Sequence, residues 1–211
     1  VSKSNNKTLV MLFVDTNNCH FSNKIIDEVV NDEAFIENIK NEMVFFKADF
    51  ATNITTSTYK VEQNEKLKRK HHVTGYPTIV LLDSKQKHIS TLGYLPMVGK
   101  KYADNIKNIV AEYFLISDTL LYFEDDEDIC VLENSHERAK KIGSMHFQKQ
   151  ILNKGLKKDK GTYFLIEKYK ILLDQGKDGT IEAIELREKI LEKDHHNISK
   201  LHLQLAILYF Q

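Results

Sequence analysis

Two short, uninterrupted apolar runs constrain the fold of this chain more than any other feature. They occupy residues 9–14 (LVMLFV) and 79–82 (IVLL). An apolar run of four to six residues is typical of a strand that is buried on both faces, whereas a helix of that length would show a polar stripe. We therefore expect both runs to be strands in a sheet that helices cover on its two faces.

The segments around these runs predict the order β-α-β-α-β-β-α. Apolar residues return at helical spacing after the first run, and a five-residue polar link near the second run is typical of an antiparallel hairpin. Two βαβ-type crossovers followed by this hairpin predict a mixed α/β sheet. The expected strands are residues 9–14, 43–49, 78–82 and 88–92, and the expected helices are about 22–39 with a break at 31–32, about 61–71 and about 101–116.

After Ser117 the pattern becomes wholly helical. The acidic cluster at 124–128 is expected to be a solvated loop rather than a binding site. Short links between the later helices predict antiparallel hairpins, and residues 193–197 resemble the joint between tetratricopeptide-type repeats. The expected helices are about 135–153, 160–174, 179–193 and 198–210, with Gly155, Gly161, Gly176 and Gly179 as stops and turns. The expected divisions are a domain at 1–116, an acidic linker at 117–134 and an α-helical hairpin region at 135–211.

Composition excludes several classes of function. Thirty basic and thirty acidic residues cancel, which argues against a nucleic-acid partner because such a partner requires a basic face. No run approaches the 18 apolar residues of a membrane span. Two cysteines argue against a disulfide framework. The pairs His71-His72 and His195-His196 are adjacent, so their side chains point about 100° apart on a helix and share no ligand face; we expect no metal and no cofactor.

The first candidate motif, Cys19-His20-Phe21-Ser22, follows the first strand where a helix is expected to begin. Free N–H groups at a helix start favour the thiolate, which is the nucleophile in disulfide exchange. A protonated His20 would add to this effect, and the Ser22 hydroxyl can donate a hydrogen bond to the sulfur but cannot form a disulfide. The competing interpretation is an incidental cysteine that behaves as a small hydrophobe.

The second candidate motif, Gly75-Tyr76-Pro77-Thr78, lies directly before the second apolar run. A proline at a strand start, after an aromatic residue, suits a cis peptide bond, which is rare enough to be a deliberate feature. Such a loop exposes backbone N–H and C=O groups that can pair with an extended peptide. An ordinary turn is the alternative. Together the two motifs predict a thiol that faces a proline loop.

These motifs make residues 1–116 resemble the thioredoxin superfamily. The similarity is greatest to its bacterial envelope branch of disulfide reductases and isomerases, which includes the DsbD C-terminal domain and DsbH. The strand-CxxC-helix motif of the family falls on residues 13–23, and its V-x-G-Y-P-T loop falls on residues 73–78. The resemblance implies a thioredoxin-like mixed sheet flanked by helices, followed here by the helical-hairpin region.

The resemblance also assigns roles to residues. It implies that Cys19 is the attacking thiol, that Tyr76 and Pro77 flank it, and that Pro77 follows a cis bond. His20 and Phe21 complete the expected substrate-binding surface. It further implies a periplasmic or other extracytoplasmic location, with the cytoplasm as the alternative.

Three departures from the family pattern change the expected chemistry. Ser22 replaces the second cysteine, no tryptophan precedes Cys19, and Phe13 stands where many thioredoxins carry a buried acid. Reversible dithiol reduction by the usual route should therefore fail, whereas monothiol isomerase, mixed-disulfide or chaperone-like behaviour stays open. Ser22 is either native or a replacement of a natural cysteine, an exchange that traps mixed disulfides.

The predicted function is thiol–disulfide interchange on protein substrates that carry disulfides or thiols. Cys19 would be the nucleophile and Ser22 its hydrogen-bond partner, and the C-terminal helices would bind a protein partner or a second copy. The alternative is a redox-inert thioredoxin-like adaptor that binds a protein without chemistry. Because the chain opens at Val1 rather than Met and stops within a helical pattern at Gln211, we expect it to be part of a longer protein.

Other reactive or charged residues have simpler interpretations. Cys130 follows the acidic cluster, and acidic neighbours raise the pKa of a thiol and lower its reactivity, so we expect a structural cysteine. Pairing with Cys19 is the alternative. Asp15 is expected to cap the turn before Cys19 rather than transfer protons, and residues 66–70 (KLKRK) are expected to be the solvated face of a helix.

Overall fold

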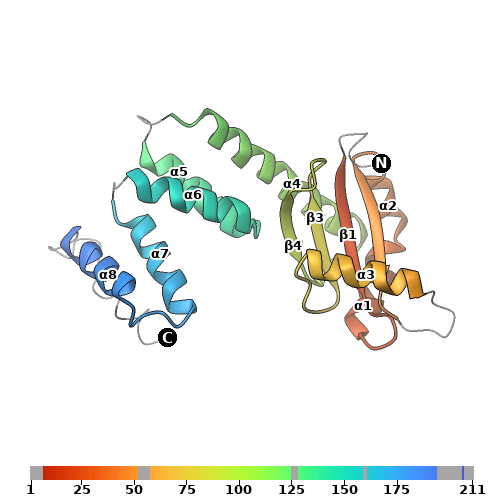
Figure 1. The fold of residues 1–211 in the computed structure, drawn as a ribbon. Helices are drawn as coiled ribbons and strands as arrows, with labels where there is room; N and C mark the ends of the chain where they lie inside the picture. The colour runs from red at the N-terminus through yellow and green to blue at the C-terminus, as the bar shows by residue number, and fades with distance from the viewer. Residues whose placement is uncertain (1–6, 52–57, 125–127, 159–160, 194–205, 207–211) are drawn as a thin grey trace. The chain divides into compact units, whose positions relative to one another are not determined.

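The strands of the computed structural model form one mixed sheet with the order β2-β1-β3-β4 (Figure 1). β1 is parallel to β2 and antiparallel to β3, and β3 is antiparallel to β4. The two apolar runs are the central strands, as predicted. The strands are β1 (Thr8–Val14), β2 (Met43–Asp49), β3 (Thr78–Leu82) and β4 (His88–Leu92). The structure describes residues 7–51, 58–124, 128–158, 161–193 and 206.

The connection from β2 to β3 differs from the expected crossover. β1 and β2 run in the same direction and finish at the same end of the sheet. β3 begins at that end, because Thr78 lies opposite Phe13. The connection through α3 (Thr58–Lys70) therefore leaves and re-enters the sheet at the same end of the strands. A parallel crossover would instead re-enter at the opposite end. The prediction of a second βαβ unit was wrong. This reversal brings the start of β3 beside the end of β1, where the two candidate motifs lie.

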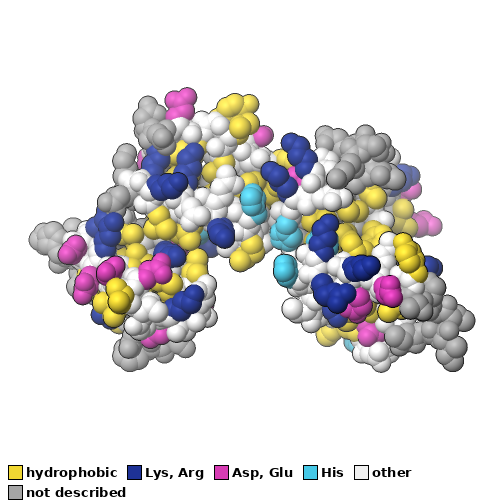
Figure 2. All heavy atoms as spheres, in the orientation of Figure 1, with side chains coloured by type: hydrophobic (Ala, Val, Ile, Leu, Met, Phe, Trp, Pro, Cys, Tyr) yellow, Lys and Arg dark blue, Asp and Glu magenta, His cyan; other side chains and the backbone are white. Residues whose placement is uncertain are grey.

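Both faces of β1 are buried, which explains the apolar residue at every position from Leu9 to Val14. Met11 and Phe13 belong to a buried cluster that Leu67 of α3 packs against, and α3 crosses this face in Figure 1. Val10 is paired with Phe45 on the other face. There the ring of Phe45 contacts Phe35 in an edge arrangement, with ring centroids 6.1 Å apart. The outer side of α3 carries charged side chains of both signs (Figure 2).

Helices cover the other face of the sheet as well. Phe35 packs edge-on against Tyr102 of α4, with ring centroids 6.4 Å apart. Burial of Tyr102 raises the pKa of its phenol. The helices that precede β2 or follow β4 in this part are α1 (His20–Ile25), the π-helix η1 (Ile26–Val30), α2 (Glu33–Ile39) and α4 (Gly99–Tyr122).

The later helices differ from their expected bounds. α4 continues past residue 116 to Tyr122, and α5 (Ile129–Lys141) begins inside the expected linker. The helix expected at 135–153 is two helices, α5 and α6 (Met145–Lys158), which are separated where Gly143 has φ 69°. Glycine adopts this left-handed conformation readily and so ends helices. The helix expected at 198–210 lies outside the described residues.

The contacts of the backbone divide the chain into two units at positions other than the predicted ones. Unit 1 contains Val1–Leu121 and Ala139–His146, and unit 2 contains Tyr122–Arg138 and Phe147–Gln211. Within unit 1, the Oγ of Ser90 on β4 donates to the carbonyl oxygen of Ile142, which joins the edge strand to the turn after α5. In the described part of the chain, no helix is long and apolar enough to cross a membrane.

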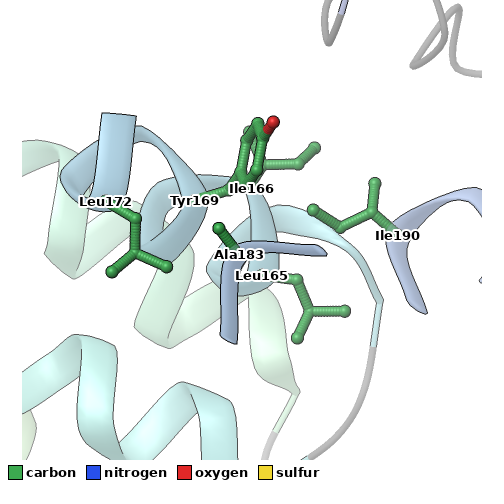
Figure 3. Close-up of a cluster of buried hydrophobic side chains, with 6 residues drawn as sticks. All are labelled: Leu165, Ile166, Tyr169, Leu172, Ala183 and Ile190. Carbon is green, nitrogen blue, oxygen red and sulfur yellow. The ribbon is translucent and has the colours of Figure 1, made fainter. Parts of the chain in front are cut away.

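The core of unit 2 lies between α7 (Tyr163–Asp174) and α8 (Ile181–Lys193), which form a hairpin. Figure 3 draws six buried apolar side chains of this cluster, which come from both helices. Gly155, expected to end a helix, instead lies inside α6. A Cβ at this position would collide with the ring of Phe164, which explains the glycine. The six residues are Leu165, Ile166, Tyr169, Leu172, Ala183 and Ile190.

Candidate functional site

Cys19 is the N-cap residue of α1 and follows the C-terminal end of β1. Its backbone N–H donates to the carbonyl oxygen of Asp15 at 3.0 Å, and its own carbonyl oxygen accepts from the N–H of Ser22 at 3.0 Å. Its side chain makes no capping hydrogen bond. The residue is partly exposed and is a free thiol, so it is accessible to a reaction partner.

The thiol faces the proline loop. Its Sγ donates to the carbonyl oxygen of Tyr76 at 3.2 Å, across 57 residues of sequence. The Tyr76–Pro77 peptide bond is cis, as the resemblance implies. Thr78 closes the loop by donating from its Oγ1 to the carbonyl oxygen of Gly75 at 2.7 Å. The two motifs therefore form one site.

The exposure of the residues in this loop differs from one to the next. Pro77 is buried, whereas Gly75 is exposed and Tyr76 is partly exposed. Among the described residues, the N–H of Tyr76 has no hydrogen-bond acceptor. Pro77 was expected to contact substrate; it is buried, whereas Gly75 and Tyr76 of the same loop are at least partly exposed.

Ser22 has a different partner from the one that the sequence predicts. Its side chain is buried, at 0% exposure, and its Oγ accepts from the N–H of Asp15 at 3.1 Å. Among the described residues, no hydrogen bond joins this hydroxyl to the sulfur of Cys19. The hydroxyl therefore stabilises the turn between β1 and α1.

The carboxylate of Asp15 stabilises the same turn. Its Oδ1 accepts from the backbone N–H groups of Asn17 at 3.2 Å and Asn18 at 3.1 Å. Both oxygens also accept from the Asn18 side-chain amide. This pattern confirms the predicted turn cap, since these hydrogen bonds occupy both carboxylate oxygens.

An aromatic surface lies on the side of Cys19 where α1 begins. His20 is exposed and Phe21 is 51% exposed, and their ring centroids are 5.7 Å apart. The ring of Phe21 also lies 5.2 Å from that of Tyr94, a residue to which the sequence analysis assigned no role. Tyr94 donates its hydroxyl to Glu28 at 2.8 Å, and this bond raises the pKa of the phenol. His20 and Phe21 thus lie at the surface beside the thiol.

A second group of rings lies on the loop side, together with a lysine. The ring centroids of Tyr76 and Phe50 are 5.1 Å apart. Lys68 of α3 donates from Nζ to the Tyr76 hydroxyl at 2.8 Å, and this bond raises the pKa of the lysine. The sequence analysis predicted that Lys68 is solvated like the other residues of its basic run, because these residues differ in their surroundings only once the helix packs on the sheet.

Cys130 is an exposed free thiol in unit 2. A hydrogen bond to Asp128 is the main cause of a raised pKa of this thiol, in the direction that its acidic neighbours predict. In the part of the chain that the structure describes, no three His, Cys, Asp or Glu residues gather closely enough to hold a metal ion. The pair His195-His196 lies outside the described residues.

Comparison with known proteins agrees with this geometry. Residues 1–98 match the family described as thioredoxin-like domain. The chain is 25% identical to the thioredoxin-related protein DsbJ of Chlamydia pneumoniae over 193 residues, which is 89% of this chain and 54% of DsbJ. It is 23% identical to the disulfide bond reductase DsbH of the same organism over 107 residues, which is 51% of this chain and 64% of DsbH.

A solved structure supports the fold. The DsbH oxidoreductase aligns with a TM-score of 0.50 and 23% identity over 52% of this chain and 76% of that chain. This chain spans about half the length of DsbJ and less than two thirds of DsbH. Residues 1–98 are therefore similar to a thioredoxin-like domain in sequence and in fold, and the chain is similar to the bacterial proteins DsbJ and DsbH.

Proposed function

We propose that this chain exchanges thiols and disulfides on protein substrates, with Cys19 as its single nucleophile. One observation carries the proposal: a partly exposed free thiol lies 3.2 Å from the carbonyl oxygen of Tyr76, in a loop whose Gly75 is exposed and whose Tyr76 is partly exposed. The names of the relatives, a thioredoxin-related protein and a disulfide bond reductase, support the same class of chemistry.

The first step is attack on a substrate disulfide. The Cys19 thiolate forms a bond to one substrate sulfur and the substrate S–S bond breaks, which leaves a mixed disulfide. The other substrate sulfur departs as a thiolate and takes a proton from water. Ser22 has no thiol to release the complex, so the second step requires another sulfur.

Two sources of that sulfur give two outcomes. A further substrate cysteine, other than the one released in the first step, can attack the substrate sulfur of the mixed disulfide, which forms a new substrate disulfide and returns the Cys19 thiolate. No net electrons are transferred, so the result is isomerisation. Alternatively, external thiols release the substrate: they are oxidised to a disulfide and the substrate is reduced.

The surface around the thiol supports a peptide as substrate. A backbone carbonyl oxygen of an extended substrate segment can accept a hydrogen bond from the N–H of Tyr76, as in strand addition. This hydrogen bond would align the substrate cysteine with Cys19. The exposed rings of His20 and Phe21 would contact the neighbouring substrate side chains. Partly exposed aromatic rings are suited to such contacts because they bury much apolar area with few rotatable bonds.

We further propose a periplasmic or other extracytoplasmic location, with the helices of unit 2 as a platform for a protein partner. Disulfides persist in oxidising compartments, where substrates of this chemistry are found. The two bacterial Dsb relatives support this location. Cell fractionation with an antibody to the protein tests it, and recovery with cytoplasmic markers would contradict it.

Comparison of the two cysteines tests the reaction. The C130S variant retains only Cys19, and C19S retains only Cys130. Each is incubated with oxidised glutathione at pH 7, and the glutathione adduct is followed by intact mass. We expect C130S to react several-fold faster than C19S, because the hydrogen bond that the Cys130 thiol donates to Asp128 disfavours the thiolate of Cys130.

Isomerisation of a protein with scrambled disulfides completes the test. Wild type and C130S should restore the activity of that protein, and C19S should not. Equal recovery with C19S would overturn the role of Cys19. A chain in which neither assay depends on Cys19 would instead be a redox-inert adaptor.

A further inference from the structure

We propose that Lys68 is a positioning residue that holds the Tyr76 loop in place for peptide substrates. The inference rests on the proposed function and deepens it, because it assigns the docking of a peptide, as distinct from the reactivity of the sulfur, to a residue outside both motifs. Lys68 acts through Tyr76, and the described structure shows no hydrogen bond between Lys68 and Cys19.

The side chain of Lys68 makes three contacts with two aromatic residues. Its Nζ donates to the hydroxyl of Tyr76 at 2.8 Å and lies 4.9 Å from the centroid of the same ring. It also lies 5.3 Å from the centroid of Phe50. Hydrogen bonds that involve a charged donor and cations above aromatic rings both restrict the ring that they contact.

Tyr76 is consequently held at both ends. The hydroxyl at the tip of its ring accepts from Lys68, and its backbone carbonyl oxygen accepts from Cys19 at 3.2 Å. The carbonyl oxygen of Lys68 also accepts from the N–H of Val73 at 3.0 Å, just before the loop. Lys68 thus anchors the segment that leads into the loop and the ring at its centre.

The neighbouring basic residues of α3 lack these contacts. Lys66, Arg69 and Lys70 are exposed, whereas Lys68 is half-buried. Lys66 makes no ion pair and no ring contact among the described residues, so it provides a control with the same charge on the same helix. A role that depended only on the charge of α3 would be shared by Lys66, but a role in positioning Tyr76 would not.

The experiment compares two kinds of disulfide in the C130S background. One is a peptide disulfide, which needs the docking loop, and the other is the small, neutral 2-hydroxyethyl disulfide, which does not. We expect K68M and Y76F each to lower the rate constant for the peptide about tenfold, the scale of one hydrogen bond to a charged group. The rate of K68M with the small disulfide should stay within about twofold, since Lys68 makes no hydrogen bond to the sulfur.

Further variants separate positioning from general damage. The double variant K68M/Y76F should lose no more than K68M alone, because K68M already removes the hydrogen bond that Y76F removes. K68R should restore most of the peptide rate, since a guanidinium can donate to the hydroxyl and stack on the ring. K66M should match the parent. Equal loss with both disulfides, or no loss with the peptide, would overturn the proposal.

A readout that does not depend on activity distinguishes this inference from the proposed function. Amide hydrogen exchange of residues 73–78 should be faster in K68M than in K66M. If the parent reacts with neither disulfide, the proposed function fails, and exchange alone decides whether Lys68 holds the loop. Unchanged exchange in K68M would contradict the positioning role.

Discussion

Replacement of Ser22 by alanine tests which role its hydroxyl plays. The side chain is 0% exposed, and its Oγ accepts the Asp15 N–H at 3.1 Å. Alanine would leave that N–H without its acceptor in a partly buried turn. Losing one partner of a buried hydrogen bond costs about 1–3 kcal/mol, so we expect S22A to lower the free energy of unfolding by that amount.

Ser144 offers a matched control in the same unit. It is also 0% exposed, but its Oγ has no hydrogen-bond partner in the described structure. S144A removes an unsatisfied hydroxyl, so its free energy of unfolding should equal or exceed that of wild type. Urea unfolding at pH 7, monitored by circular dichroism, compares the midpoints at a common slope. Equal midpoints for S22A and wild type would refute the structural role of Ser22.

The same variant tests the hydrogen bond that the sequence predicts between Ser22 and the sulfur. If the hydroxyl acts only on the turn, S22A and its parent should form the glutathione adduct of Cys19 at rates within about twofold, because the sulfur keeps its Tyr76 partner. A large fall in the adduct rate, with stability unchanged, would favour the direct contact. The two readouts therefore distinguish the two roles.

Three further results are expected. Burial lowers the pKa of His71 and of His88, so the unfolded chain binds more protons than the folded one, and the free energy of unfolding should fall as the pH drops below about 6.5. Over this pH range the urea midpoint should fall less in H71Q/H88Q than in wild type. An equal fall in both proteins would contradict this explanation. G155A should lower the unfolding midpoint because its methyl group meets the Phe164 ring, whereas an unchanged midpoint would refute that packing. S22C should create insulin reduction, and none would contradict the assumed site geometry.

Local sequence patterns predicted the strands and most helices of unit 1 because burial on a sheet or along a helix imposes a period on the sequence. The runs 9–14 and 79–82 became the central strands, and the five-residue polar link became the β3–β4 hairpin. The sequence analysis predicted the wrong direction of β3 relative to β1, because a helical connection of this length can re-enter a sheet at either end of its strands. The break at Gly143 was missed because periodicity on both sides of it is helical.

Within the site, the residue types were predictable but several of their partners were not. Cys19 and the Tyr76 loop were expected to meet, and they do. The partner of Ser22 was not foreseen because a buried hydroxyl bonds to whichever polar group the turn brings within about 3 Å. Lys68 was not foreseen for a related reason: its contacts depend on how α3 lies across the sheet.

The amino-acid sequence by itself determined the mixed sheet, the thiol at a helix start and the proline loop before a strand. Each is a property of a few consecutive residues, whose polarity and backbone preferences are readable in order. The tertiary structure decided which groups are partners: the Tyr76 carbonyl for Cys19, the Asp15 N–H for Ser22 and the Tyr76 ring for Lys68. Hydrogen bonds act over about 3 Å in space, and only the packed chain sets that distance between residues far apart in sequence.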